Sequence, residues 1–451
     1  MENHEAVTAA GTDGRKPKRF TKTEKSWIFY DWANSIYATN IMAAIFPIYF
    51  AMQATDTGDK IYGFAVSAAT FVVALLAPIL GAIGDFRGMK KKLFAAFLLI
   101  GLVFTATMAI FESWQYMLVG FVLSRIGFSG TCLFYDSFLT DVTTPERMDK
   151  VSTWGYAAGY IGGSTIPFII SIVVMLLMGQ SILSYKIAIL IVVVWWALFS
   201  IPFLKNVKQN FCVDEPPEKL AKAAFKNMVG TFKDIVKDKR ILLFILAYFF
   251  YIDGVDTIIS MATNYGSTLG LGTIGMILAL LVTQLVAVPF SILFGNLAKK
   301  VGGIKMISIA VGVYFVITIL GFIMGYNIEH AEAVGADMEA AIHTSTILFW
   351  ILAGLVGTVQ GGIQALSRSY FGKLIPPERS NEFYGFLDIF GKFSCVIGPA
   401  LYALVYSLTD KASLGILSII LLFLAAGITL FAGRKHFKGV DSDVEEVASP
   451  Q

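Results

Sequence analysis

The sequence predicts an all-α integral membrane protein with twelve transmembrane helices in two homologous six-helix halves. Three observations predict this fold class: long apolar segments, an asymmetry in lysine and arginine, and an internal repeat. The 451 residues are 56% apolar and only 15% charged, with a mean hydropathy of +0.70. A soluble domain averages about 25% charged residues, so the charge deficit indicates a membrane protein.

Twelve apolar windows are long enough to cross a bilayer as helices, because about 20 residues span roughly 30 Å of hydrocarbon. They are continuous apolar runs, unlike the alternating ten-residue segments of barrel strands. We expect the helices at 28–52, 61–84, 93–111, 116–139, 153–178, 184–204, 241–264, 272–297, 305–326, 345–368, 382–407 and 412–433.

Lysine and arginine are distributed unequally between the segments that connect these windows. Of the 35 basic residues, 29 fall on one side, and three of the others, Arg125, Arg368 and Lys392, lie inside windows. The positive-inside rule places the basic side, with both termini, in the cytoplasm. The expected organisation is a disordered basic tail (1–26), an N-terminal half (27–204), a cytoplasmic linker (205–240), a C-terminal half (241–434) and a cytoplasmic tail (435–451). Within the linker, Lys219 to Ile235 has the periodicity of an amphipathic surface helix.

An internal repeat relates the two halves. One set recurs at a spacing of 232 residues: Gly130, Pro145, Glu146, Arg147, Gly159 and Pro167 return as Gly362, Pro377, Glu378, Arg379, Gly391 and Pro399. Another recurs at 214: Gly81, Gly88 and Lys91 return as Gly295, Gly302 and Lys305. A polar loop expected from about 327 to 344 accounts for the 18-residue difference. Such repeats are a hallmark of transporter folds.

The segment Gly81 to Leu93 forms a short basic loop between the second and third windows. Gly88 permits a tight reversal, and Asp85 can cap a helix or pair with a base. The segment resembles the signature loop of the major facilitator superfamily, which implies a gating loop made by Gly81, Asp85, Arg87, Gly88 and Lys90. An ordinary positive-inside turn is the alternative. Arg125 resembles the helix-4 arginine of the same superfamily.

A closer resemblance covers most of the chain. Its motifs are Asp31-Trp32-Ala33-Asn34-Ser35, Gly155-Tyr156-Ala157 and Gly362-Ile363-Gln364-Ala365-Leu366-Ser367-Arg368-Ser369. They are similar to those of the vacuole-effluxer-like branch of the superfamily, which has bacterial members and a fungal vacuolar protein implicated in amino-acid export. The resemblance implies transport of a small solute, such as an amino acid, across a bacterial cytoplasmic membrane.

Polar residues inside the windows are candidates for the transport site, because a charge at mid-bilayer is costly unless it is paired or faces water. They form stripes at helical spacing on the first, fourth, seventh and tenth helices, which line the central cavity in the resembled fold. The candidate substrate and ion cavity comprises Asp31, Asn34, Arg125, Asp136, Asp253, Asp256, Gln360, Gln364, Asp388 and Lys392.

Several of these residues have a structural alternative. Asp388 and Lys392 lie one turn apart and can form a purely structural pair. Asp31 can be a first-turn acid stabilised by the helix dipole. Gly155, Gly159 and Gly163 resemble part of an antiporter motif, but small residues every four positions also permit close helix packing. Asp253, about twelve residues from the cytoplasmic end of its window, has no such simple explanation.

The expected function is secondary active transport of a small solute by alternating access, coupled to protons. The alternative is a non-transporting receptor or scaffold built on a transporter fold. We expect a monomer in contact with membrane lipid, with no nucleic-acid partner, no cofactor and no metal. An enzyme is not expected, because the sequence lacks a metal-ligand cluster or a nucleophile with its base. A phosphate-binding loop is also absent, which disfavours ATP-driven transport.

Overall fold

A computed structural model describes residues 19–54, 56–179, 181–213, 215 and 219–440. Within them every regular element is helical, and twelve helical segments are long and apolar enough to cross a membrane. The predicted fold class is therefore confirmed. Residues 1–18 of the expected basic tail and 441–451 of the expected C-terminal tail lie outside the described residues.

The N-terminal half contains six spans. The first consists of α2 (Lys22–Ile36), η1 (Tyr37–Ala44) and α3 (Ile45–Gln53), and the fifth of α8 (Pro145–Ala158), η2 (Gly159–Thr165) and α9 (Ile166–Leu177). The others are α4 (Asp56–Gly84), α5 (Met89–Ile110), α6 (Trp114–Ser137) and α10 (Ile182–Asn206), and the short helix α7 (Leu139–Val142) follows α6.

Helix α11 (Leu220–Lys237) joins the halves and includes most of the linker segment that was predicted to be helical. The C-terminal half then contains α12 (Lys239–Thr268), α13 (Thr273–Val301), α14 (Gly303–Val334), α15 (Met338–Leu374), η3 (Pro377–Arg379), α16 (Ser380–Thr409), α17 (Ala412–Ser418) and α18 (Ile420–Phe437).

Two spans change their hydrogen-bond register near a proline. The π-helical segments η1 and η2 end shortly before Pro47 and Pro167. Proline has no N–H and its ring clashes with the carbonyl one turn earlier. The wider π turn accommodates that break without ending the span.

The predicted polar loop at 327–344 is wrong, because most of it is helical. Helix α14 runs to Val334 and α15 begins at Met338. Gly335 ends α14 in the left-handed conformation, and the Asp337 carboxylate accepts hydrogen bonds from the N–H groups of Glu339 and Ala340. These caps allow a polar helical hairpin to extend beyond the apolar windows.

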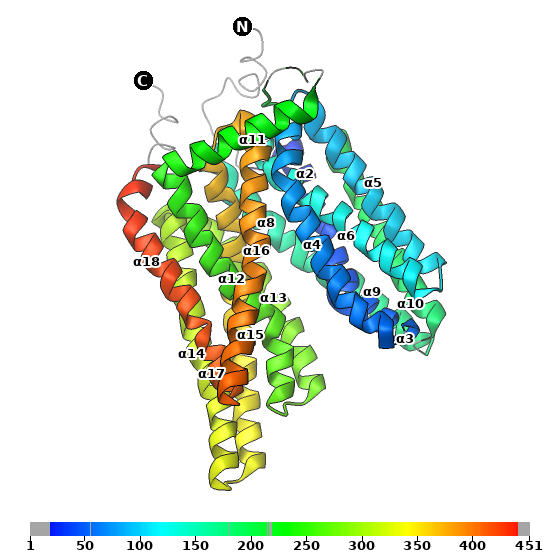
Figure 1. Cartoon of the computed structure of the whole chain (residues 1–451), viewed down its shortest axis with the longest axis vertical. Helices are drawn as coiled ribbons and strands as arrows, with labels where there is room; N and C mark the ends of the chain where they lie inside the picture. Colours follow the sequence, from blue (N-terminus) through cyan, green and yellow to red (C-terminus); the bar gives the residue numbers. More distant parts are fainter. Residues whose placement is uncertain (1–18, 55, 180, 214, 216–218, 441–451) are drawn as a thin grey trace.

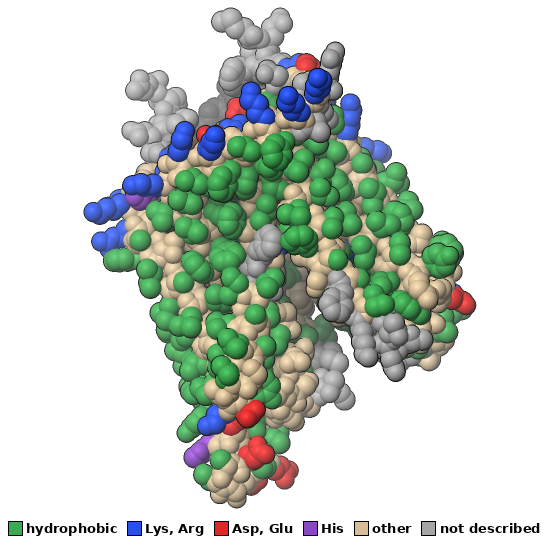
Figure 2. Space-filling model, in the orientation of Figure 1, with side chains coloured by type: hydrophobic (Ala, Val, Ile, Leu, Met, Phe, Trp, Pro, Cys, Tyr) green, Lys and Arg blue, Asp and Glu red, His purple; other side chains and the backbone are tan. Residues whose placement is uncertain are grey.

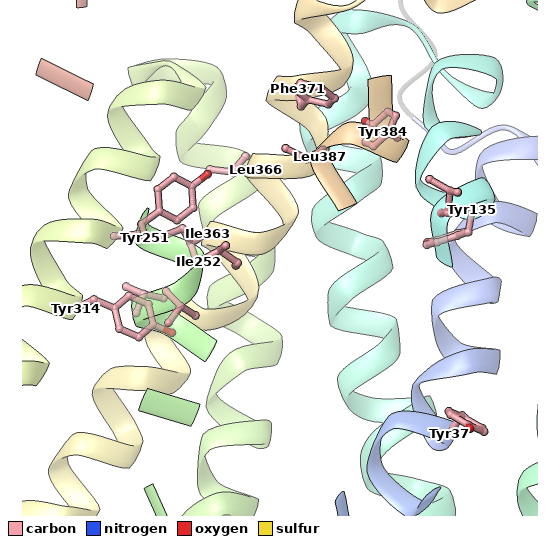
Figure 3. Packing of buried hydrophobic residues seen from close by; sticks show 14 of the residues in the cluster. Tyr37, Tyr135, Tyr251, Ile252, Tyr314, Ile363, Leu366, Phe371, Tyr384 and Leu387 are labelled. Atoms are coloured by element: carbon pink, nitrogen blue, oxygen red, sulfur yellow. The ribbon is translucent and has the colours of Figure 1, made fainter. Parts of the chain in front are cut away.

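The two halves meet at one end of the molecule and separate at the other (Figure 1). The end where they meet carries α11 and most of the visible lysines and arginines, and we call it the basic end (Figure 2). At the opposite end the space-filling view shows a hollow between the halves. Buried aromatic residues pack within each half, such as Tyr37 and Tyr135 in one and Tyr251 and Tyr314 in the other (Figure 3).

Candidate transport site

Arg368 of α15 connects the two halves through carboxylates of the N-terminal half. Its Nη1 lies 2.9 Å from Asp136 Oδ1 on α6, and its Nη2 lies 3.3 Å from Asp31 Oδ2 on α2. Its Nε donates to Ser152 Oγ on α8, at 2.9 Å. The arginine side chain is only 6% exposed. Three helices of the N-terminal half thus bind one cation of the C-terminal half, and we call this the Arg368 cluster.

Aromatic rings enclose the guanidinium of Arg368. Its Cζ lies 4.6 Å from the ring centre of Trp27, 5.2 Å from Tyr135 and 4.7 Å from Tyr156. The Tyr135 hydroxyl also donates to Asp31 Oδ2, at 2.8 Å. Cation–π contacts strengthen when the cation is removed from water, so the rings help to retain the charge in the bilayer.

Gly155 makes the close approach of these charges possible. A Cβ atom at this position would lie 2.5 Å from Asp31 Oδ2 and 3.2 Å from Arg368 Nη2. Any larger residue would push the carboxylate from the arginine. Gly155 therefore permits close helix packing, which was the structural alternative for this glycine motif. The groups that it packs against are those of the Arg368 cluster.

The predicted gating loop docks on the C-terminal half. Asp85 accepts hydrogen bonds from the backbone N–H groups of Asn381 and Glu382, at 2.9 and 3.0 Å, and from Asn381 Nδ2 at 2.8 Å. These groups belong to the first turn of α16, where a helix favours negative charge. Burial nevertheless raises the pKa of the Asp85 carboxyl from its ordinary 3.8 to about 7, although Lys90 and the two backbone donors act in the opposite direction.

Lys90, the second residue of α5, is fully buried. Its Nζ is 2.7 Å from Asp141 Oδ2 and 2.9 Å from Ser380 Oγ, so it also joins the halves. Gly88 adopts the left-handed conformation, at φ 71°, that the reversal requires. Arg87 differs from its neighbours: it pairs with Glu215, 3.1 Å away, and both side chains are exposed.

Two further contacts between the halves are related by the internal repeat. Ser137 Oγ contacts the Asn381 side chain, and Ser369 Oγ donates to Asp149 Oδ1 at 2.6 Å. Adding 232 to 137 and to 149 gives 369 and 381, so each contact is the counterpart of the other. A residue pair and its exchanged counterpart are the signature of a two-fold interface. Lys373 extends the second contact, with its Nζ 2.7 Å from Asp149 Oδ2.

Asp253, the residue without a simple explanation in the sequence, is fully buried in the C-terminal half. Its oxygens lie 2.9 and 3.1 Å from the backbone nitrogen of Gly398, and Thr257 Oγ1 is 3.4 Å away. Gly398 precedes Pro399 inside α16. The carboxylate therefore accepts a hydrogen bond at the point where proline disturbs the helix.

The remaining predicted residues lie outside the Arg368 cluster. Lys392 and Asp388 form the expected pair on α16, and Arg125 Nη2 donates to Thr70 Oγ1 at 3.1 Å. The side chain of Asn34 lies near Cys132, with its Nδ2 3.9 Å from the Sγ atom. Gln360 lines a mostly apolar cavity of about 110 Å³ inside the C-terminal half. Asp256 and Gln364 are half-buried on α12 and α15.

Arg368 is absent from the predicted cavity residues, although it is one of the three basic residues inside the windows. The signal that could have identified it is the free-energy cost of placing a charged side chain inside the bilayer. No such cost marks Asp149, Ser152 or Lys373, because they lie just outside the apolar windows. Among the described residues, no three His, Cys, Asp or Glu side chains are grouped so that they could hold a metal ion.

Solved transporters of the major facilitator superfamily share this fold. Human organic anion transporter MFSD10 has a TM-score of 0.67 at 14% identity, covering 92% of this chain and 100% of that one. A bacterial homologue of the iron transporter ferroportin, in an outward-facing state, has 0.65 at 14% identity, covering 92% and 98%. The proton:xylose symporter XylE has 0.62 at 11% identity, covering 95% and 98%. The fold is therefore that of the major facilitator superfamily.

The chain belongs to the family described as vacuole effluxer Atg22 like, whose model matches residues 59–436. It is 43% identical to the MFS-type transporter YxiO of Bacillus subtilis (strain 168) over 429 residues, covering 92% of this chain and 95% of that protein. It is 28% identical to autophagy-related protein 22-2 of Aspergillus clavatus over 291 residues, covering 60% of this chain and 46% of the fungal protein. The match therefore spans less than half of that fungal relative.

Proposed function

We propose that this protein is a secondary active transporter that moves a small solute across the bacterial cytoplasmic membrane by alternating access. In this proposal the structure represents the outward-open state, closed at the basic end and open at the opposite end. The observation that carries the proposal is the position of the contacts between halves. The Arg368 cluster, the Asp85 loop and the two Ser contacts all close the basic end, while the hollow in Figure 2 opens the other.

The orientation follows from the charge distribution, because basic loops remain in the cytoplasm. Cysteine labelling tests it in intact cells. Glu112→Cys, whose native side chain is 74% exposed, and Gly335→Cys should react with an impermeant maleimide from outside. Lys222→Cys and Lys438→Cys, also at exposed positions, should react only after the membrane is opened. Labelling of the last two in intact cells would reverse the orientation.

Proton coupling is supported by the chemistry of the Arg368 cluster. Asp31 and Asp136 share one guanidinium, and each loses its attraction to it when protonated. A proton bound to either carboxylate would therefore weaken the closed basic end, and its release would restore it. In this way a pH gradient biases which state the transporter occupies.

The solute and its direction rest on the relatives. The family description supports efflux, and amino acids are the solute class that the sequence resemblance implies. The similarity to a proton:xylose symporter supports only the fold, so it does not favour a sugar. We therefore propose amino-acid efflux as the first activity to test.

Counterflow in proteoliposomes tests the function. Vesicles preloaded with each member of a panel of amino acids should accumulate the matching radiolabelled solute, and an imposed pH gradient should drive net movement of the same solute. Arg368→Gln should reduce both rates at least tenfold. The matched control is Arg240→Gln, which removes a half-exposed arginine that pairs with Asp238, two residues away in sequence and 2.9 Å away. If no solute in a broad metabolite panel exchanges, the transporter proposal fails in favour of a receptor or scaffold.

A further inference from the structure

Helix α11 lies across the basic end and presents three distinct faces. One face packs on the protein: Ala224, Thr231 and Ile235 are at most 2% exposed. Residues spaced by three, four or seven positions share one side of a helix. The other two faces therefore follow from the spacing of the remaining residues.

The second face is apolar and is only partly covered by protein. Phe225, Val229, Phe232 and Val236, at i, i+4, i+7 and i+11, are between 38% and 57% exposed. At about 100° per residue this stripe lies roughly a quarter turn from the buried face. Four exposed apolar side chains in line mark an interaction surface.

The third face carries a row of lysines, namely Lys222, Lys226, Lys233 and Lys237. It lies about another quarter turn around the helix, beside the apolar stripe. At the C-terminal end of α11 the row borders an open hollow of about 640 Å³, lined by Lys237, Lys239, Arg240, Lys435 and His436 with Asp234 and Asp238. Figure 2 shows basic side chains along this edge with apolar surface below them.

The helix also contacts both halves. It packs against α4 of the N-terminal half and against α12 and α16 of the C-terminal half. Arg379 Nη1, just before α16, lies 2.7 Å from Asp234 Oδ2. Phe232 approaches Phe386 of α16, with ring centres 6.1 Å apart. Separation of the halves at the basic end would therefore remove part of the surface on which α11 rests.

We propose that α11 lies in the headgroup region of the membrane, where its apolar stripe enters the acyl boundary and its lysine row binds anionic phospholipid headgroups, and that this docking favours closure of the basic end. Both faces fit such a surface: amphipathic helices bury an apolar face at the interface, and adjacent lysines extend to the phosphates. Lysines near an anionic leaflet add electrostatic attraction that salt screens. The effect on closure rests on the alternating-access function proposed above, whereas the docking itself does not.

A fluorophore on the stripe tests the docking. The full chain, with its three native cysteines replaced by serine, carries Val229→Cys labelled with an environment-sensitive nitrobenzoxadiazole. It is placed in nanodiscs of phosphatidylcholine alone or with 30% phosphatidylglycerol. We expect a blue-shifted emission and at least threefold less quenching by aqueous iodide with phosphatidylglycerol, and loss of this difference at 1 M salt. Aqueous emission in both lipids would overturn the proposal in favour of a protein partner for the stripe.

The lysine row has a matched control. Replacing Lys222, Lys226, Lys233 and Lys237 by glutamine should abolish the phosphatidylglycerol effect. Replacing four other exposed lysines near the basic end by glutamine should leave it unchanged: Lys205, Lys208, Lys300 and Lys305. Equal loss in both variants would show a general charge effect and overturn the assignment to α11.

The effect of anionic lipid on closure of the basic end is measured separately from transport. Spin labels at Lys92→Cys and Glu378→Cys, exposed positions at the basic ends of opposite halves, should give a shorter, narrower distance distribution with phosphatidylglycerol. The α11 glutamine variant should lose that change. Docking without a change in this distance would overturn the effect on closure. Neither readout requires a known solute, so their failure is distinct from failure of the proposed transport.

Discussion

Arg368 and Asp136 are ion-paired across the two halves at 2.9 Å, and they are 232 residues apart. This separation equals the spacing of the internal repeat, so the two residues occupy equivalent positions in their halves. A residue that contacts its own counterpart must lie on the axis that relates the halves. The symmetric position holds an acid in one half and a base in the other, which turns potential like-charge repulsion into attraction.

The first prediction concerns this axial pair. Arg368→Ala leaves Asp31 buried without its cation. Breaking a buried ion pair costs about 3 to 5 kcal/mol. We expect the closed state to lose about 3 kcal/mol, the lower end of this range, because Asp136 is partly exposed. Spin labels at Lys92→Cys and Glu378→Cys should then show separation of the basic ends.

The charge-reversed double variant provides the control. Asp136→Arg with Arg368→Asp restores opposite charges on the axis, and it should recover part of the closed population and of the counterflow. Asp136→Arg alone should not, because it places two arginines together. A double variant no better than either single variant would show that the pair does not act as a unit.

The second prediction concerns Gly155. The added Cβ of Gly155→Ala would displace Asp31 from Arg368 and should reduce transport at least tenfold. Gly354→Ala on α15 is the matched control, since its Cβ would meet nothing within 4 Å. The control should transport normally and be slightly more stable, because alanine is the better helix former. Normal counterflow by Gly155→Ala would exclude the close approach as a requirement.

The third prediction is a pH dependence set by Asp85. Its pKa of about 7 in the closed state lies above the ordinary 3.8, so the closed state binds the proton more tightly than a state in which the loop is free. The contribution of Asp85 to closure is therefore complete below about pH 4, is lost as the pH rises to 7 and is constant above 7, opposite in sign to the contribution proposed for Asp31 and Asp136. Relative to Asp85→Asn, which keeps the contributions of Asp31 and Asp136, the wild-type Lys92 to Glu378 distance should lengthen between pH 5 and pH 7 but not between pH 8 and pH 9.

Asp85→Asn serves as the control for this titration. Its amide oxygen can still accept a backbone hydrogen bond, but it has no titrating proton. The distance between the labels should then no longer lengthen between pH 5 and pH 7. An unaltered pH dependence in this variant would assign the titration to another group.

The apolar windows, the periodicity of the linker and the repeat allowed the spans, helix α11 and the two halves to be predicted from sequence. Asp31 and Asp136 were also found, because a carboxylate in an apolar window is costly enough to stand out. Their partner could not be predicted, since spacing along one helix says nothing about which helix of the other half it meets. The predicted loop at 327–344 failed for a related reason: polar composition marks exit from the bilayer, but not the end of a capped helix.

The fourth prediction concerns Asp253. Asp253→Asn should fold and insert normally, because the amide oxygen still accepts the Gly398 N–H. If this acid couples transport to protons, the variant loses accumulation driven by a pH gradient but keeps solute exchange. Asp253→Leu, which has no acceptor, should also lose stability. Accumulation by Asp253→Asn at the wild-type level would remove this residue as the coupling acid and leave Asp31 and Asp136.

Cross-linking across the basic end tests alternating access most directly. Ser137 and Asn381 touch across the halves, as do their counterparts Ser369 and Asp149. Paired cysteines at either contact, in the background without native cysteines, should form a disulfide that stops counterflow, and reduction should restore it. Each single cysteine, treated identically, should remain active. Both cross-linked pairs exchanging solute at the rate of their reduced forms would contradict the account, because transport would then proceed with the basic end permanently closed.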